Sequence, residues 1–299
     1  MVRNVPSGLI RFLGIALLIF CFQPSYAQPQ SPEKAFKVFD ATLYAQKPDL
    51  SVYGLLPITV VYPDSFGMEW YRQNNQEVPN KAVVQAVAHG VLSKGNPVVL
   101  DIEHWRVWGE KRVIQENLKK YMTILQWMKE IAPSLAFGYY GLPPLRNYGA
   151  VQNELKTGEY KAWMWGNDQL KPLAEAVDAL YPSLYTFYED RAGWRKFALG
   201  QIAEARRYGG DKPIYVFFWP QYHEGNKALA GTYLPEDYWR LQLQTAREYA
   251  DGIVIWGGWG NNHRPAAWDD AAPWWRVTKE FLLETGLDGP APPIGLKVH

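Results

Sequence analysis

At residues 97–105 the sequence reads Pro97-Val98-Val99-Leu100-Asp101-Ile102-Glu103-His104-Trp105, an apolar run that passes directly into two acidic residues. An apolar run without alternation between apolar and polar side chains is typical of a parallel strand covered on both faces. Comparable runs occur at residues 56–62, 135–140, 178–185, 213–219 and 252–256. The sequence therefore predicts a sheet of parallel strands.

Segments with helical periodicity fill most of the gaps between these runs. Apolar residues recur at three- and four-residue spacing at residues 81–92, 113–131, 194–208, 235–249 and 268–284. The alternation predicts an α/β fold. With one or two weaker strands added, at 36–43 or 162–165, the pattern favours a TIM-like (β/α) barrel of seven or eight strands. A doubly wound open sheet is the alternative, but no Gly-rich phosphate loop follows any strand.

The composition is that of one globular domain with no strong net charge. The 299 residues are 47% hydrophobic and 20% charged, and 31 Lys and Arg face 30 Asp and Glu, for a formal charge of +1. Such a balance gives no global field for nucleic acid or an anionic membrane, so neither is expected as a partner. We expect a signal peptide at 1–27, a leader at 28–50, one catalytic barrel at 51–288 and a loose tail at 289–299.

The first residues have the pattern of a secretory signal. Arg3 and Arg11 precede an apolar run at 12–22, and Ser25-Tyr26-Ala27 offers small residues for cleavage after Ala27. The run is about half of the roughly 20 residues needed to span a bilayer. We therefore expect a secreted or periplasmic protein without stable membrane insertion; an uncleaved anchor is the alternative.

Cysteine chemistry is excluded for the mature chain. Cys21 is the only cysteine, and it lies in the segment expected to be removed. A lipoprotein attached through Cys21 is less favoured, because bulky Phe20 stands where a small residue is needed. The mature chain therefore has no disulfide, no catalytic thiolate and no Cys-ligated zinc.

Asp101 and Glu103 are the strongest candidates for chemistry. Side chains two residues apart on a strand share one face, with Cα atoms about 6.5–7 Å apart. Ionising one carboxyl group raises the pKa of the other, which is how an acid stays protonated near neutral pH for use as a proton donor. Solvated charges at the end of a strand, or an ion pair with Arg106, are the structural alternatives.

The ends of the other strands are rich in aromatic residues, which suits a sugar ligand. Ring C–H groups of a sugar stack on an aromatic face, and phenol hydroxyls donate to sugar oxygens. The candidate ligand-binding residues are Trp105, Tyr139, Tyr140, Tyr185, Trp219 and Trp256. Within the helical segments, Trp127, Trp194 and Trp239 are expected in the core.

No cofactor or metal ion is expected. Together with Asp101 and Glu103, three histidines could suggest a metal site, but His104, His223 and His263 show no metal-ligand spacing such as His-Glu-x-x-His. We expect His104 to pack beside the acid pair and His223 to lie in a loop. Ser183 lies in a Pro-Ser-Leu-Tyr turn and not in the Gly-x-Ser-x-Gly elbow of a nucleophilic serine.

Five segments together resemble the hyaluronidase family. The first is Leu100-Asp101-Ile102-Glu103-His104-Trp105-Arg106, which matches the family pattern Asp-x-Glu-x-Trp-Arg after an apolar run. The others follow in the family's order: Phe137-Gly138-Tyr139-Tyr140-Gly141-Leu142-Pro143, Tyr181-Pro182-Ser183-Leu184-Tyr185, Lys212-Pro213-Ile214-Tyr215 and Asp251-Gly252-Ile253-Val254-Ile255-Trp256-Gly257. This resemblance spans roughly residues 50 to 285.

The resemblance implies a distorted TIM-like barrel that hydrolyses β-linked N-acetylhexosaminides with retention. In this family the acetamido oxygen of the substrate replaces a protein nucleophile. By position, Glu103 would protonate the leaving oxygen and Asp101 would steady positive charge on the acetamido nitrogen. Tyr140 and Tyr185 would fix the acetamide, and Trp256 would wall its pocket. The implied partner is a polysaccharide or oligosaccharide that contains N-acetylhexosamine, such as hyaluronan.

The chain departs from the family pattern in ways that leave the polymer open. The mature chain has no disulfide, Ile102 replaces an aromatic residue, and Val107 replaces a proline. A groove for a polyanion needs cations, and the candidates are Arg106, Lys111, Arg112, Arg146, Arg191 and Arg264. A carbohydrate-binding barrel without turnover and a chitinase-like hydrolase of different linkage choice are the alternatives.

Overall fold

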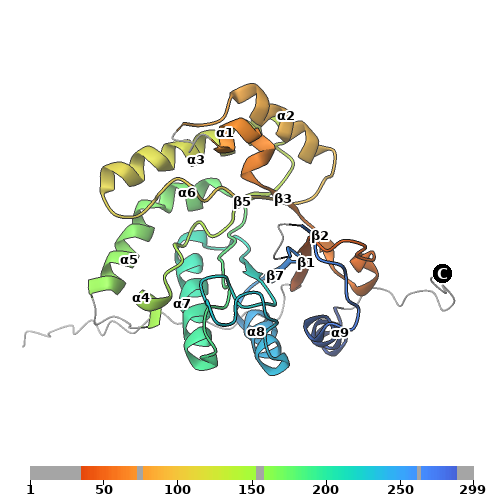
Figure 1. Ribbon diagram of the computed structural model, residues 1–299. Helices are drawn as coiled ribbons and strands as arrows, with labels where there is room; N and C mark the ends of the chain where they lie inside the picture. Colours follow the sequence, from red (N-terminus) through yellow and green to blue (C-terminus); the bar gives the residue numbers. More distant parts are fainter. Residues whose placement is uncertain (1–34, 73–76, 153–157, 261–263, 288–299) are drawn as a thin grey trace, which may run out of the picture.

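Parallel strands line the centre of the molecule and helices surround them, in a computed structural model that describes residues 35–72, 77–152, 158–260 and 264–287 (Figure 1). The elements in chain order are β1 (Lys37–Thr42), η1 (Leu50–Tyr53), β2 (Leu56–Pro57), β3 (Thr59–Val61), η2 (Pro63–Phe66), α1 (Met68–Arg72), α2 (Lys81–Leu92), β4 (Val98–Leu100), α3 (Lys111–Ile131), β5 (Phe137–Tyr139), α4 (Tyr148–Gln152), α5 (Gly158–Gln169), α6 (Lys171–Ala176), α7 (Arg191–Gly209), β6 (Tyr215–Phe218), α8 (Glu236–Tyr249), β7 (Gly252–Gly257) and α9 (Pro273–Thr285).

The strands close into a ring through two sheets and the bridges between them. One sheet has the order β2-β1-β7-β6 and the other β3-β4-β5, with parallel pairing throughout. Residues 180–183 join β5 to β6 through the parallel bridges Tyr140↔Tyr181, Leu180↔Ile214 and Ser183↔Phe217. Only Ile58 separates β2 from β3. Within the described residues this gives a distorted TIM-like barrel of seven strand positions and rules out an open sheet.

Alternate residues of the strands point into the barrel. One buried cluster contains residues from around the ring, among them Phe39, Val99, Tyr181, Phe217 and Val254. Their neighbours along the chain belong to the second, larger cluster, which also includes buried residues of the helices. Since the strand period is two and the ladder continues to the Asp101 N–H, the inward direction of Val99 continues to Asp101.

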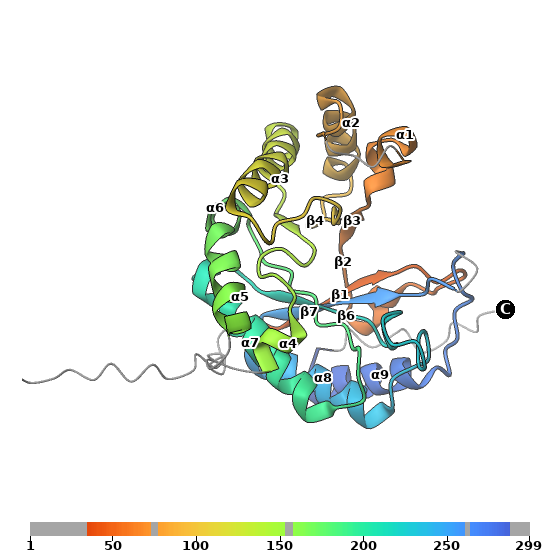
Figure 2. The same cartoon turned by 60° about the vertical axis from the view of Figure 1, so that its left-hand side comes forward.

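The helices form the outer layer, as Figure 2 shows for α2, α3, α5, α7, α8 and α9 around the strands. The buried helix residues include Trp194 and Trp239, which are 1% and 0% exposed, and Trp127 packs against this core. The expectation of core positions is confirmed for Trp194 and Trp239, whereas Trp127 is half-buried at the edge of the core. None of the helices in the described residues is long and apolar enough to cross a membrane.

Three sequence expectations about the strands need correction. Residues 162–165 lie inside α5 and are not a strand. The weaker strand expected at 36–43 is present as β1 (37–42), so the barrel begins inside the segment expected to be a leader. Residues 178–185 take part only in isolated bridges. The expected signal peptide at 1–27 and the tail at 289–299 lie outside the described residues.

One close approach between neighbouring strands requires a glycine. A Cβ atom added to Gly138 in β5 would lie 2.4 Å from the carbonyl oxygen of Ala179 and 2.5 Å from the ring of Tyr181. No side chain fits there without moving the backbone. The glycine therefore lets the segment at 180–183 pack against β5.

Candidate active site

Asp101 and Glu103 leave the barrel strand at its carboxyl end. The Asp101 N–H still donates to the Val61 carbonyl at 2.9 Å, so the ladder between β3 and β4 extends to the first acid. Beyond it, the buried hydroxyl of Tyr121 in α3 lies 3.0 Å from the carbonyl oxygen of Ile102 and 3.1 Å from that of Trp105. A residue of the helix layer therefore braces the backbone on both sides of Glu103.

The two carboxyl groups hold protons more tightly than free ones. Burial raises the pKa of Asp101 to about 7, and the charge of Glu103 adds to the shift. Burial also raises the pKa of Glu103, and the guanidinium of Arg146 works against that rise. Interacting carboxyl groups titrate as a pair, so the proton retained near neutral pH belongs to both. This arrangement can supply a general acid at neutral pH.

Aromatic residues from four strand positions surround the inner acid. The Tyr185 ring stacks on Trp256, with centroids 5.9 Å apart, and lies 5.7 Å from Tyr140. Trp219 meets Trp256 edge to face at 5.0 Å. Burial raises the pKa of the Tyr140 and Tyr185 phenols, and the charge of Asp101 adds to both shifts. These phenols therefore stay protonated and can donate hydrogen bonds beside Asp101.

Tyr62 and Ser183 join this group although the sequence did not single them out as ligands. The Trp256 indole N–H donates to the Tyr62 hydroxyl at 2.9 Å, and burial raises the pKa of Tyr62 to about 12. The Ser183 hydroxyl lies 2.9 Å from that of Tyr140. Their only sequence signal is position, since each lies at or near the end of a barrel strand or strand-like segment.

A cleft of about 670 Å³ opens beside Glu103, whose side chain is exposed within it. Its lining comes from the segment after β4, the loop after β5 and helix α5, and includes Glu103, Trp105, Trp108, Tyr140, Arg146, Glu159, Trp163, Trp165 and Ser183. The lining does not include three of the candidate ligand-binding residues, Tyr185, Trp219 and Trp256, which lie on the side of β6 and β7. A chain-like ligand in the cleft would therefore reach the acid pair from the side of α5.

Two of the eight expected site residues have other surroundings. Tyr139 is fully buried, and its hydroxyl donates to the Tyr121 carbonyl at 2.8 Å, so it faces α3 and not the barrel interior. Trp105 lines the cleft but is only 2% exposed, with its ring packed among Trp70, His104 and Tyr121. The structure brings together the other six: Asp101, Glu103, Tyr140, Tyr185, Trp219 and Trp256.

No metal site is evident in the part of the chain that the structure describes, where no three His, Cys, Asp or Glu side chains converge. His104 stacks edge to face against Trp70 and Trp105, and burial lowers its pKa. His223 lies against Phe187, with ring centroids 4.3 Å apart. Both imidazoles are packed against aromatic rings.

Residues 68–267 match the sequence profile of glycoside hydrolase family 56, which is described as hyaluronidase. Similar proteins are a hyaluronidase of Loxosceles intermedia, 32% identical over 154 residues, and hyaluronidase-2 of Ovis aries, 28% identical over 176 residues. These alignments cover 48% and 52% of this chain and 36% of each relative. The chain thus matches only about a third of the length of these relatives.

Two solved structures share the fold over most of the chain. The crystal structure of bee venom hyaluronidase aligns with a TM-score of 0.58 and 18% identity, covering 83% of this chain and 97% of the other. The complex of bee venom hyaluronidase with a hyaluronic acid tetramer aligns with a TM-score of 0.55 and 18% identity, covering 83% and 96%. At this identity the likeness concerns the barrel fold alone.

Proposed function

The chain belongs to the hyaluronidase family, and from that premise we propose that it is a glycoside hydrolase that cleaves β-linkages at N-acetylhexosamine residues of a polysaccharide such as hyaluronan. One observation carries the proposal. Asp101 and Glu103 follow β4 at its carboxyl end with raised pKa values, Glu103 in the lining of a cleft and Asp101 beside the aromatic residues of the barrel. A hyaluronic acid tetramer bound to a structural relative supports this substrate class.

Glu103 is proposed as the proton donor because it is the acid exposed in the cleft. Its carboxyl proton passes to the glycosidic oxygen as the bond to the anomeric carbon breaks. The resulting carboxylate then takes a proton from the water that attacks in the second step. Removing a general acid of this kind slows hydrolysis by about 10²- to 10⁴-fold.

The substrate's acetamido oxygen is proposed as the nucleophile, with overall retention at the anomeric carbon. An attacking group tethered to the same sugar gains the proximity advantage of an intramolecular reaction. Asp101 lies behind Glu103 on the inward face, where its negative charge stabilises the positive charge that develops on the acetamido nitrogen. The phenols of Tyr140 and Tyr185, close to Asp101, hold the acetamide in place.

Export from the cytoplasm is proposed on the basis of the amino-terminal pattern at residues 1–27. Mass spectrometry of the protein secreted by an expressing cell should find Gln28 as the first residue. A product that begins at residue 1 would point to the uncleaved anchor.

The test of the activity is Glu103→Gln, assayed by release of reducing ends from hyaluronan, chondroitin and chitin oligomers. We expect loss of turnover with nearly unchanged thermal unfolding, because the amide keeps the size of the side chain and removes only the transferable proton. Glu116→Gln on the exposed face of α3 is the matched control. Wild-type turnover by Glu103→Gln would refute the role. No turnover by the native protein on any of these polymers would indicate a binding barrel.

A further inference from the structure

Of the six cationic residues that are candidates for binding a polyanion, one, Arg146, lines the cleft. Arg112 pairs with Glu116 at 2.7 Å on the outside of α3, and Arg191 pairs with Asp237 at 2.8 Å. Arg146, in the loop after β5, is exposed and lines the cleft with Glu103. Of the six, Arg146 is therefore the cation placed to meet a ligand beside the proton donor.

The guanidinium of Arg146 is held by neutral groups. One amino group donates to the Ser183 hydroxyl at 3.2 Å, and the guanidinium carbon lies 5.3 Å from the centroid of the Phe187 ring. Among the described residues, no carboxylate lies within 4.0 Å of it, although its charge acts on Glu103. A guanidinium presents several N–H donors in a rigid fork that matches both oxygens of a carboxylate. Arg146 therefore keeps donors available for an anion in the cleft.

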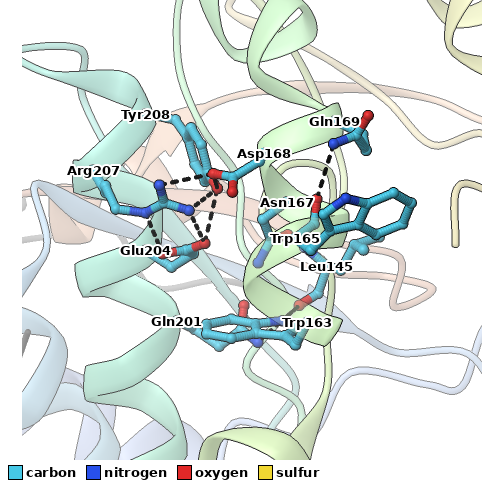
Figure 3. Close-up of polar contacts among 10 residues, drawn as sticks. All are labelled: Leu145, Trp163, Trp165, Asn167, Asp168, Gln169, Gln201, Glu204, Arg207 and Tyr208. Atoms are coloured by element: carbon cyan, nitrogen blue, oxygen red, sulfur yellow. Dashed lines mark hydrogen bonds and ion pairs between the residues drawn. The ribbon is translucent and has the colours of Figure 1, made fainter. Parts of the chain in front are cut away.

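The backbone next to Arg146 is fixed by three side chains from two helices (Figure 3). The Leu145 N–H donates to the side-chain oxygen of Asn167 at 2.8 Å. The Leu145 carbonyl accepts from the indole of Trp163 at 2.6 Å and from the amide of Gln201 at 3.0 Å. Asn167 and Gln201 are fully buried. We call these three side chains the Leu145 clamp; it holds both polar backbone groups of the residue before Arg146.

An ion pair ties the two helices of the clamp together. Arg207 of α7 makes two hydrogen bonds of 2.8 Å to buried Glu204 and one of 2.9 Å to Asp168 of α5 (Figure 3). Glu204 is 4% exposed, so this carboxylate is well shielded from solvent. The contact between Arg207 and Asp168 thus links α5 to α7 beside the clamp.

The other charged residues of the cleft determine how Arg146 would affect the choice of substrate. Glu103 and Glu159 both line the cleft, so without Arg146 an acidic sugar would meet mainly negative charge. With Arg146 held in place, a carboxylate finds a bidentate donor next to the Ser183 hydroxyl. A neutral sugar has no group of matching charge.

We propose that Arg146, positioned by the Leu145 clamp, binds the carboxylate of a uronate residue next to the cleaved N-acetylhexosaminide and so selects acidic over neutral glycans. The inference rests on the proposed function and adds the residue that sets the substrate class. The guanidinium is the binding group, and Asn167, Gln201 and Trp163 are positioning residues.

The test compares hyaluronan with hyaluronan whose carboxyl groups have been reduced to hydroxymethyl groups. The wild type is expected to prefer the native polymer in kcat/KM by about 10- to 100-fold, the effect of one charge-assisted contact. Arg146→Gln should abolish that preference, mainly through a higher KM on the native polymer. Arg276→Gln, which removes an exposed arginine paired with Glu236 on the outer helices, is the control and should keep it.

Equal losses on both polymers in Arg146→Gln would overturn the proposal, because they would mean that Arg146 acts only on the proton donor. Asn167→Ala tests the clamp and should lower the preference while kcat on the reduced polymer stays within a few-fold. A preference unchanged in Asn167→Ala would overturn the positioning role.

If the wild type cleaves neither polymer, the proposed function fails. Calorimetric binding of native and reduced oligosaccharides to wild type and Arg146→Gln then decides the role of Arg146 alone.

Discussion

Replacing Asp101 by asparagine is expected to make the protein more stable above neutral pH and to flatten the pH dependence of its stability. Burial raises the pKa of Asp101 from 3.8 to about 7, so the folded chain holds this proton where the unfolded chain has released it. Below about pH 4 both states are protonated and the group has no effect. As the pH rises from about 4 to 7, the unfolded state gains by ionisation and folding stability falls.

The size of this effect follows from the shift in pKa. A rise of about 3 units, at about 1.4 kcal/mol for each unit, destabilises the fold by at most about 4 kcal/mol once Asp101 is ionised in both states. Asparagine has nearly the same shape and no charge to bury. Relative to the wild type, we therefore expect Asp101→Asn to gain up to about 4 kcal/mol above pH 7 and to differ little near pH 4.

Urea unfolding followed by circular dichroism, at intervals between about pH 4 and 8.5, measures this difference. Asp64→Asn removes an equal charge from an exposed position and should leave the pH dependence as in the wild type. The reasoning is refuted if Asp101→Asn and the wild type lose stability in parallel as the pH rises. The same variant should lose most of its turnover, so stability and activity would change in opposite directions.

Two further substitutions test the surroundings of the acids. Tyr185→Phe removes a phenol beside Asp101 and should lower kcat/KM by about 10- to 100-fold through the loss of a hydrogen bond to the acetamide, with the melting temperature within a few degrees of the wild type; an unchanged rate would contradict that role. Gly138→Ala forces a Cβ atom against the Ala179 carbonyl and should destabilise the fold by about 3 kcal/mol or more, measured by urea unfolding; Gly95→Ala, at an open site with positive φ, separates this clash from backbone strain alone.

The sequence was sufficient to predict the barrel because the strand signals are local. The apolar run before Asp101 and the helical periodicity of residues 113–131 each require only neighbouring residues to be recognised. The segment at 178–185 was harder, because its side chains alternate inward and outward as in a strand while its backbone makes only isolated bridges. The weak strand expected at 162–165 was wrong, because these residues belong to α5.

The acid pair was predictable because its signal is also local, whereas the position of Arg146 beside it was not. The prediction that Asp101 and Glu103 act together needed only their spacing directly after an apolar run. Arg146 was one of six candidate cations, and only the folding of the loop after β5 places it in the cleft. The sequence does not mark Asn167 or Gln201, because an amide side chain in a helix is usually exposed and only its partner shows that it is buried. Their partner is the backbone of Leu145, which carries no sequence signal at all.

The hydroxyl of Tyr121 joins the peptide groups around Glu103 to α3, a helix of the outer layer. A shift of α3 along its axis would therefore move the backbone that carries Glu103. The outer helix layer in this way helps to position the proposed proton donor. Redesign of the surface of that helix must therefore keep the Tyr121 hydroxyl in contact with both carbonyl groups, while its exposed positions remain open to change.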